Sequence, residues 1–198
     1  MYLMCRYRWL FIWVLFASLL PLAADSQEGP KDAVVLIIRH AEDGATGPGL
    51  TPSGQERAEA YKDYFLNFTV DSKRLRPDAV FAAKDSKKSH RPRLTVEPFA
   101  KAANLKIDAR FDNNQSTELA TDLRANDQGK VILICWRHPY VPDLLRALGA
   151  NPEELLPRGK WPNAVYDWLI LLSYDQDGRL IPARTRRINE HLMPGDSQ

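Results

Sequence analysis

The chain has 198 residues, of which 44% are hydrophobic and 26% charged, and only 10 are glycine. This length predicts a single domain, and the composition excludes the disordered, collagen-like and disulfide-rich classes. The 27 basic and 25 acidic side chains leave a net charge of +2. That charge is too small for a protein that binds by neutralising many phosphates of a polymer, so nucleic acid is not expected as a partner.

The first 24 residues have the pattern of a secretory signal peptide. Arg6 and Arg8 precede the apolar run 9–20, and small residues end the segment at Ala24, ahead of a polar stretch. An uncleaved membrane anchor is the alternative, but an unbroken span needs about 20 apolar residues and this run is shorter. We therefore expect cleavage near Ala24 and a secreted or periplasmic mature protein with no stable membrane insertion.

Cleavage at this point changes the charge balance of the chain. Residues 1–24 contain two Arg and no acidic residue, so the mature chain keeps 25 basic and 25 acidic side chains and has no net charge. We expect residues 25–32 to form a mobile lead-in and residues 33–198 to form a single domain. The mature chain keeps Cys135 alone; because it ends an apolar run, we expect a buried small hydrophobe without a disulfide partner.

Four short apolar runs predict buried strands, and helical patterns lie between them. The strands are expected at 33–38, 78–82, 130–135 and 166–173. Thr51 can cap a helix that has Pro52 in its first turn, and further helices are expected at 95–103 and 142–148. Strands that alternate with helices predict an α/β fold, namely a three-layer sandwich with a mainly parallel central sheet flanked by helices.

Basic side chains and histidines follow three of these strands. Arg39 and His40 end the first strand, the basic stretch 84–93 follows the second, and Arg137 and His138 follow the third. Taken singly, an Arg or His after a strand is usually a solvated loop residue. Ligands of an open parallel sheet bind beyond the carboxyl ends of its strands, so the repeated pattern predicts that these side chains converge on one site.

Two imidazoles and two guanidinium groups suit phosphoryl transfer. Arg binds the oxygens of a phosphate dianion with two parallel hydrogen bonds, and an imidazole can attack phosphorus and hold it covalently. A second, protonated imidazole can donate to the same oxygens as charge builds. A zinc site is the alternative, but the metal would share its pocket with guanidinium groups. We therefore expect neither a metal nor a cofactor.

Four blocks of sequence resemble, in order, the motifs of the histidine phosphatase superfamily, which has the phosphoglycerate mutase-like fold. The blocks are residues 36–42 (LIIRHAE), 50–58 (LTPSGQERA), 89–95 (SHRPRLT) and 131–149, which contains His138. The resemblance spans roughly residues 33–173. One Arg-His pair would carry no information, whereas four motifs in order with matching flanks are specific.

The resemblance implies a role for each motif residue. The nucleophile that becomes phosphorylated would be His40, and the phosphate pocket would be completed by Arg39, Arg91 and His138. Arg93 is the alternative to Arg91 as the second phosphate-binding arginine. In the family this arginine stands four residues before the threonine of the motif, here Thr95, and this spacing favours Arg91.

Two features depart from the family pattern. Arg137 stands where members commonly have Gly or Ser before the second histidine. Larger members carry the general acid in an insertion after the Thr-bearing helix, and here that interval is short. We favour Glu118 as the acid. The other carboxylates in this interval and in the loop after His40 are Asp108, Asp112, Asp122, Asp127, Glu42 and Asp43.

The function expected from these features is that of an exported, metal-independent phosphatase. It would hydrolyse a small phosphorylated compound through a phosphohistidine on His40. Hydrolysis is favoured over a mutase reaction because the short chain has little room for a lid that retains a reorienting intermediate. The alternative is a non-catalytic protein that binds a phosphate ligand in a retained pocket.

Overall fold

The structure is a computed structural model, and it describes residues 28–44 and 47–196. The leader expected over residues 1–24 and the first three residues of the expected lead-in lie outside the described residues. Within the described part, no helix is both long and apolar enough to cross a membrane.

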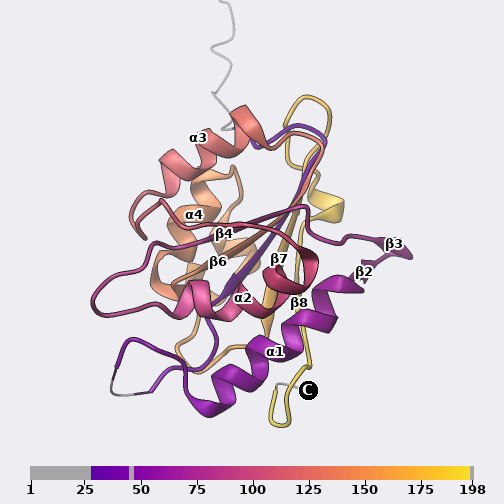
Figure 1. Cartoon of the computed structure of the whole chain (residues 1–198). Coiled ribbons are helices and arrows are strands. Elements are labelled where there is room, and N and C mark those ends of the chain that lie inside the picture. The colour runs from indigo at the N-terminus through magenta and orange to yellow at the C-terminus, as the bar shows by residue number, and fades with distance from the viewer. Residues whose placement is uncertain (1–27, 45–46, 197–198) are drawn as a thin grey trace, which may run out of the picture.

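A six-stranded sheet forms the centre of the molecule, with the strand order β5-β4-β6-β1-β7-β8 (Figure 1). Its strands are β1 (Val34–Arg39), β4 (Ala79–Ala82), β5 (Ile107–Asp108), β6 (Val131–Trp136), β7 (Trp168–Ser173) and β8 (Arg186–Asn189). The strands β5, β4, β6 and β1 run parallel to one another, whereas β7 is antiparallel to both β1 and β8. The sheet is therefore mainly parallel, as expected, with one reversed strand.

Helices cover both faces of this sheet (Figure 1). The α-helices are α1 (Pro52–Leu66), α2 (Arg91–Ala103), α3 (Ser116–Asn126), α4 (Val141–Ala147) and α5 (Pro152–Leu155). Short 3-10 turns occur at η1 (His138–Tyr140), η2 (Pro157–Gly159) and η3 (Pro182–Arg184), and β2 (Thr69–Val70) pairs with β3 (Lys73–Arg74) in a separate hairpin.

The alternation of side chains along β1 divides the core in two. Leu36 packs in a cluster with Phe65 of α1 and Phe99 of α2, whereas its neighbour Ile37 packs in a cluster with Leu119 of α3 and others from α4. Successive strand residues point to opposite faces, so an unbroken apolar strand needs helices on both sides. This arrangement confirms the predicted three-layer sandwich.

The four predicted strands and three predicted helices are all present, with shifted boundaries. The second helix begins at Arg91 instead of at 95, so the whole SHRPRLT motif lies at its start. The last predicted strand begins at Trp168, which leaves Tyr166 in the preceding loop. Cys135 is fully buried in β6 and is a free cysteine, as expected.

Part of the expected lead-in is packed against the domain. The backbone N–H of Gly29 donates to Gly178 O at 2.7 Å, and that of Asp32 donates to Asp175 O at 2.8 Å. Gly29 lies so close to Tyr174 that a Cβ atom there would sit 2.1 Å from the ring atom Cε1. Gly29 and Asp32 of the expected lead-in therefore bond to the turn that follows β7.

Candidate active site

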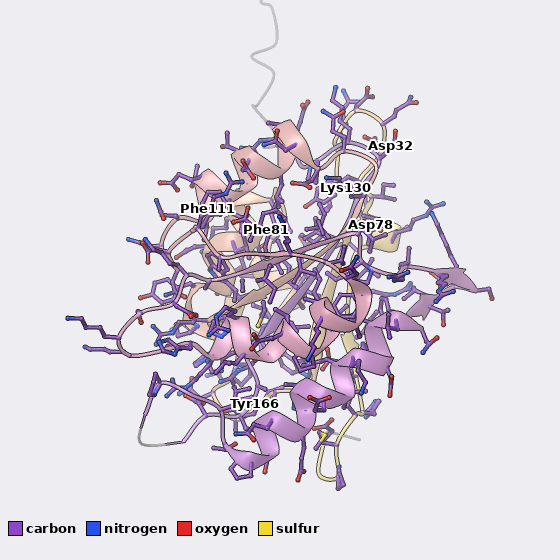
Figure 2. All side chains as sticks on the ribbon, in the orientation of Figure 1. Asp32, Asp78, Phe81, Phe111, Lys130 and Tyr166 are labelled. Carbon is purple, nitrogen blue, oxygen red and sulfur yellow. The ribbon has the colours of Figure 1, made fainter. Side chains whose placement is uncertain are left out.

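The direction of the strands determines which loops meet at the site. Asp32, Asp78 and Lys130, which precede β1, β4 and β6, lie at one end of the molecule, whereas Tyr166 lies at the opposite end (Figure 2). Because β7 is reversed, the loop that precedes it shares the sheet edge with the residues that follow β1, β4 and β6.

His40 follows β1 directly and is only 2% exposed. Its Nδ1 lies 2.8 Å from the carbonyl oxygen of Ala41. A carbonyl can only accept, so Nδ1 carries the hydrogen and Nε2 keeps a free lone pair. Burial, assisted by the charges of Arg39 and Arg91, outweighs this hydrogen bond and lowers the pKa of His40 to about 4. The imidazole is therefore neutral at pH 7, with a free lone pair on Nε2.

Arg39 is 1% exposed and is held by the loop before β7. Its Nη1 donates to the carbonyl oxygens of Asn163 at 2.8 Å and Val165 at 3.0 Å, and its guanidinium carbon lies 3.8 Å from the centre of the Tyr166 ring. Its Nε is buried and has no partner among the described residues. An unpaired buried donor is costly, so this nitrogen is available to an anionic ligand.

His138 stands at the start of η1, and its ring centre lies 6.2 Å from that of His40. Its Nε2 donates to the side-chain oxygen of Asn163 at 2.9 Å. Its Nδ1 is buried and finds no partner within the described part of the chain. Burial and the nearby Arg39 charge both lower the pKa of His138. A bound phosphate dianion would favour the protonated ring, which then donates from Nδ1.

Arg91 is the first residue of α2, and backbone carbonyls fix its side chain. Its Nε donates to Gly49 O at 3.0 Å, and its Nη2 donates to Gly47 O at 2.8 Å. The remaining Nη1 lies 3.2 Å from a carboxylate oxygen of Asp43. The charge of Arg91 also acts on the imidazole of His40. Arg91 therefore belongs to the same cationic cluster as His40.

Thr95 connects α2 to the loop after His40. Its hydroxyl accepts from the backbone N–H of Ala41 at 2.9 Å and donates to Arg91 O at 2.8 Å. Arg93, by contrast, donates from Nε to Asp85 at 2.8 Å. Arg91 therefore lies in the cluster with His40, whereas Arg93 forms a separate ion pair, and the phosphate-binding role of Arg91 stays a prediction.

The LTPSGQERA block supports the same loop from the other side. The carbonyl oxygen of Glu42 accepts from the backbone N–H of Thr51 at 3.0 Å, and a Cβ atom at Gly54 would lie 2.4 Å from that oxygen. Only glycine permits so close an approach. Arg57, which is 2% exposed, pairs with Glu42 at 2.8 Å and with Asp196 at 2.6 Å.

Glu118, the predicted general acid, lies in the first turn of α3 and is exposed. Within the described residues, no hydrogen bond or ion pair connects it to the pocket, and its role stays a prediction. Ion pairs engage most other candidates: Glu42–Arg57, Asp108–Arg110, Asp112–Lys84, Asp122–Arg110 and Asp127–Lys130. Asp43 alone of these carboxylates pairs with a residue of the pocket.

Sequence reasoning missed Asn163 and Tyr166. Both precede β7, and the sequence analysis considered only residues that follow strands. They could have been found if the reversed direction of β7 had been known. An apolar run in the sequence does not reveal the direction of its strand. Among the described residues, no group of three or more His, Cys, Asp or Glu side chains is placed to hold a metal ion.

A groove of about 390 Å³ adjoins His138. Its lining includes Arg146, Lys160, Trp161 and Asn163. The groove therefore places the cationic side chains of Arg146 and Lys160 next to the cluster.

The chain matches no protein-family model and no curated protein, but its fold matches many solved structures. A structure assigned as the phosphohistidine phosphatase SixA of Agrobacterium tumefaciens is 21% identical with a TM-score of 0.52, and the match covers 76% of this chain and 96% of that one. A phosphoserine phosphatase of Entamoeba histolytica, bound to 3-phosphoglyceric acid, is 14% identical with a TM-score of 0.54 and coverages of 81% and 100%. The chain has the fold of the histidine phosphatase superfamily.

A phosphoglycerate mutase of Plasmodium falciparum shares this histidine phosphatase fold. It is 16% identical with a TM-score of 0.51, and the match covers 84% of this chain and 96% of that one. The three structures confirm the fold that the four sequence blocks implied. At such identities the likeness establishes the histidine phosphatase fold, and the activity must be inferred from the site residues.

Proposed function

We propose that this chain is an exported, metal-independent phosphatase that hydrolyses a phosphomonoester or a related phosphorylated compound through a phosphohistidine on His40. The observation that carries the proposal is the Nδ1 hydrogen bond of His40 to Ala41 O at 2.8 Å. It directs the lone pair of Nε2 to the side of the ring opposite this bond, in a cluster with two guanidinium groups and a second imidazole.

The first half of the reaction transfers the phosphoryl group to the protein. Arg39 and Arg91 bind the oxygens of the dianion and oppose its charge, which would otherwise repel the attacking lone pair. Nε2 of His40 then attacks phosphorus, and the bond to the leaving oxygen breaks with its electron pair on that oxygen. Donation from Nδ1 of His138 stabilises the charge that builds on the other oxygens.

The second half returns the protein to its starting state. A water molecule attacks the phosphohistidine, the P–N bond breaks, and inorganic phosphate leaves. His40 regains a neutral Nε2, as its lowered pKa favours. Because guanidinium and imidazole groups supply the positive charge throughout, the reaction needs no metal ion.

The relatives and the groove guide the choice of compounds to test. One relative is assigned as a phosphohistidine phosphatase, and another is a phosphoserine phosphatase that binds 3-phosphoglyceric acid. The groove beside His138 adds the cationic side chains Arg146 and Lys160. Phosphoramidates, acyl phosphates and phosphomonoesters with a second anionic group are therefore the compounds to test first.

Turnover on such a panel tests the proposal, with His40→Ala as the inactive variant and His191→Ala as the matched control. His191 lies exposed in the C-terminal segment, and no hydrogen bond or ion pair among the described residues connects it to the cluster. We expect the parent and His191→Ala to hydrolyse at least one class, and His40→Ala to lose at least about 10³-fold in rate. Binding of inorganic phosphate without turnover of any compound would favour the alternative, a non-catalytic phosphate-binding protein.

Export is supported by the sequence pattern of residues 1–24 alone. The full-length chain, produced in a secreting host, should yield an exported protein whose mass corresponds to cleavage near Ala24. If the protein retains residues 1–24, in the exported fraction or bound to the membrane, the result would instead support the alternative that these residues are an uncleaved membrane anchor.

A further inference from the structure

The loop after His40 carries a carboxylate that reaches the phosphate pocket. One oxygen of Asp43 lies 3.2 Å from Nη1 of Arg91, and the other accepts a hydrogen bond from the Tyr166 hydroxyl at 2.8 Å. Tyr166 itself packs on the guanidinium of Arg39. Asp43 therefore lies between the two arginines of the proposed pocket.

In its ion pair with Asp43, Arg91 uses Nη1, the same nitrogen that would bind the phosphoryl group of a substrate. The other two nitrogens of Arg91 donate to Gly49 O and Gly47 O, so Nη1 is the one not committed to the backbone. A phosphate dianion offers this nitrogen more negative charge than a carboxylate does. Substrate binding and the Asp43–Arg91 pair therefore compete.

We propose that Asp43 is the group that protonates the leaving oxygen, and that the substrate's phosphoryl group frees it by taking over Nη1 of Arg91. This inference rests on the proposed phosphatase function and assigns the acid that the reaction needs. It replaces Glu118, which is exposed on α3, with a carboxylate that already pairs with a pocket residue.

The exchange of partners also changes the acidity of Asp43. Burial alone would raise its pKa, but the Tyr166 hydrogen bond and the charges of Arg91 and Arg39 outweigh burial and hold the pKa below its ordinary value. When the dianion takes Arg91, Asp43 loses that favourable charge and gains a negative neighbour. Its pKa then rises, which favours protonation of the carboxyl group when substrate is bound.

The proposed reaction conserves atoms and charge in both of its steps. The Nε2 lone pair of His40 forms the P–N bond, the P–O bond to the leaving group breaks, and the proton on Asp43 passes to the leaving oxygen to give a neutral alcohol. In the second step the Asp43 carboxylate accepts a proton from the attacking water, whose oxygen bonds to phosphorus as the P–N bond breaks. Asp43 ends each cycle protonated and returns its proton to solvent when phosphate leaves and Arg91 pairs with it again.

The test compares Asp43→Asn with the parent on phosphate esters that range from activated aryl to alkyl leaving groups. Asp85→Asn is the matched control, since Asp85 also pairs with an arginine, Arg93, at 2.8 Å, outside the pocket. Alkyl phosphates need the proton in the transition state, so Asp43→Asn should slow them by about 10²–10⁴-fold. The activated aryl ester should slow by less than about tenfold, and Asp85→Asn should match the parent on both.

A second measurement examines the exchange of partners. Inorganic phosphate should bind Asp43→Asn roughly tenfold more tightly than the parent, because the amide does not hold Arg91 by charge. Unchanged or weaker phosphate binding by this variant would overturn the exchange.

The kinetic results separate this inference from the proposed function. An equal loss on all esters would remove Asp43 as the acid, and a loss confined to alkyl esters in Glu118→Gln instead would assign the acid to Glu118. In both cases the parent still turns over, so the phosphatase proposal survives. A parent that hydrolyses no ester at all contradicts the proposed function itself, and with it the role of Asp43.

Discussion

The side chains of the site are fixed mainly by hydrogen bonds to the backbone. His40 donates to Ala41 O, Arg39 to the carbonyls of Asn163 and Val165, and Arg91 to those of two glycines. Each bond takes up one nitrogen and leaves a particular other nitrogen for the ligand. The donors are thus oriented before substrate arrives, which reduces the cost of ordering them in the transition state.

Thr95→Val tests how the nucleophile and Arg91 are held together. The substitution keeps the shape but leaves the N–H of Ala41 without its 2.9 Å acceptor in a buried place. We expect a loss of about 1–3 kcal/mol in the free energy of unfolding, measured in urea, together with a lower rate of hydrolysis.

Thr121→Val is the control for this substitution. Thr121 also bonds a carbonyl one helical turn back, at 2.9 Å from Thr117 O, but it is exposed on α3. Its change in stability should stay within about 0.5 kcal/mol. Similar losses in the free energy of unfolding for the two variants would show that the hydrogen bonds of Thr95 do not stabilise the fold more than those of an exposed threonine.

Glu190 is expected to make the folded protein less stable at alkaline pH. It follows β8, accepts from the Tyr61 hydroxyl at 2.7 Å, and burial raises its pKa to about 8, against the opposing effects of Tyr61 and Arg57. Between pH 4.5 and about 8 the folded protein therefore holds a proton that the unfolded chain has lost. The associated stability is complete below pH 4.5 and is lost as the pH rises to about 8.

Glu190→Gln removes this titration and keeps an acceptor for Tyr61. Urea unfolding at pH 5, 7 and 9 should show the parent losing up to about 4 kcal/mol more than the variant across this range. Parallel stability profiles for the two proteins would contradict the raised pKa.

At the scale of elements, the N-terminus of α1 and the C-terminal segment together support the loop after His40. Arg57 of α1 connects them, since it pairs with Glu42 in that loop and with Asp196 near the C-terminus. The three groups are largely shielded from water, so the pairs are screened little by salt.

Arg57→Met should therefore destabilise the fold strongly. It leaves the carboxylates of Glu42 and Asp196 without their shared partner, and breaking a buried pair costs about 3–5 kcal/mol. Lys62→Met on the same helix is the control, because Lys62 pairs only at the surface, 3.6 Å from Glu59, and should cost less than about 1 kcal/mol. Equal melting temperatures for the two variants would refute the role of Arg57.

The elements also show what the sequence could predict. His40 and His138 follow β1 and β6, adjacent parallel strands whose apolar runs are clear in the sequence, so their convergence was predictable. Asn163 and Tyr166 reach the same edge only because β7 runs in the reverse direction. Hydrophobicity indicates that a strand is buried but does not indicate its direction. Asn163 and Tyr166 therefore could not be predicted from the apolar run.

The general acid shows a second limit. The sequence offers seven carboxylates in the two candidate segments, and Glu118 differs from the others only by its place in the chain. The preference for Asp43 comes from its pair with Arg91 and its bond to Tyr166, both of which join residues far apart in sequence. Such contacts depend on side-chain directions in loops, which no local pattern specifies.

At the scale of the whole molecule, cationic side chains gather at one edge of a chain with little net charge. The full chain carries +2, yet the pocket places Arg39 and Arg91 beside two histidines, and the adjoining groove adds Arg146 and Lys160. The sandwich creates this concentration by bringing together the ends of its central strands. The protein therefore suits small anions without attracting polyanions over its whole surface.

Because these side chains supply the positive charge, hydrolysis should be insensitive to chelators. Activity measured before and after prolonged treatment with EDTA should agree within experimental error, and added zinc or magnesium should not raise it. Loss of activity on chelation, with recovery on addition of a metal, would show that the cationic cluster does not act alone.

Locating the phosphoryl group during turnover tests the central claim most directly. The protein is mixed rapidly with an aryl phosphate labelled with ³²P, quenched in alkali because phosphohistidine is acid-labile, and digested for peptide mapping. The structure predicts that the label resides on Nε2 of His40 and that His40→Ala acquires none. Label on any other residue, or equal labelling of His40→Ala, would contradict the account.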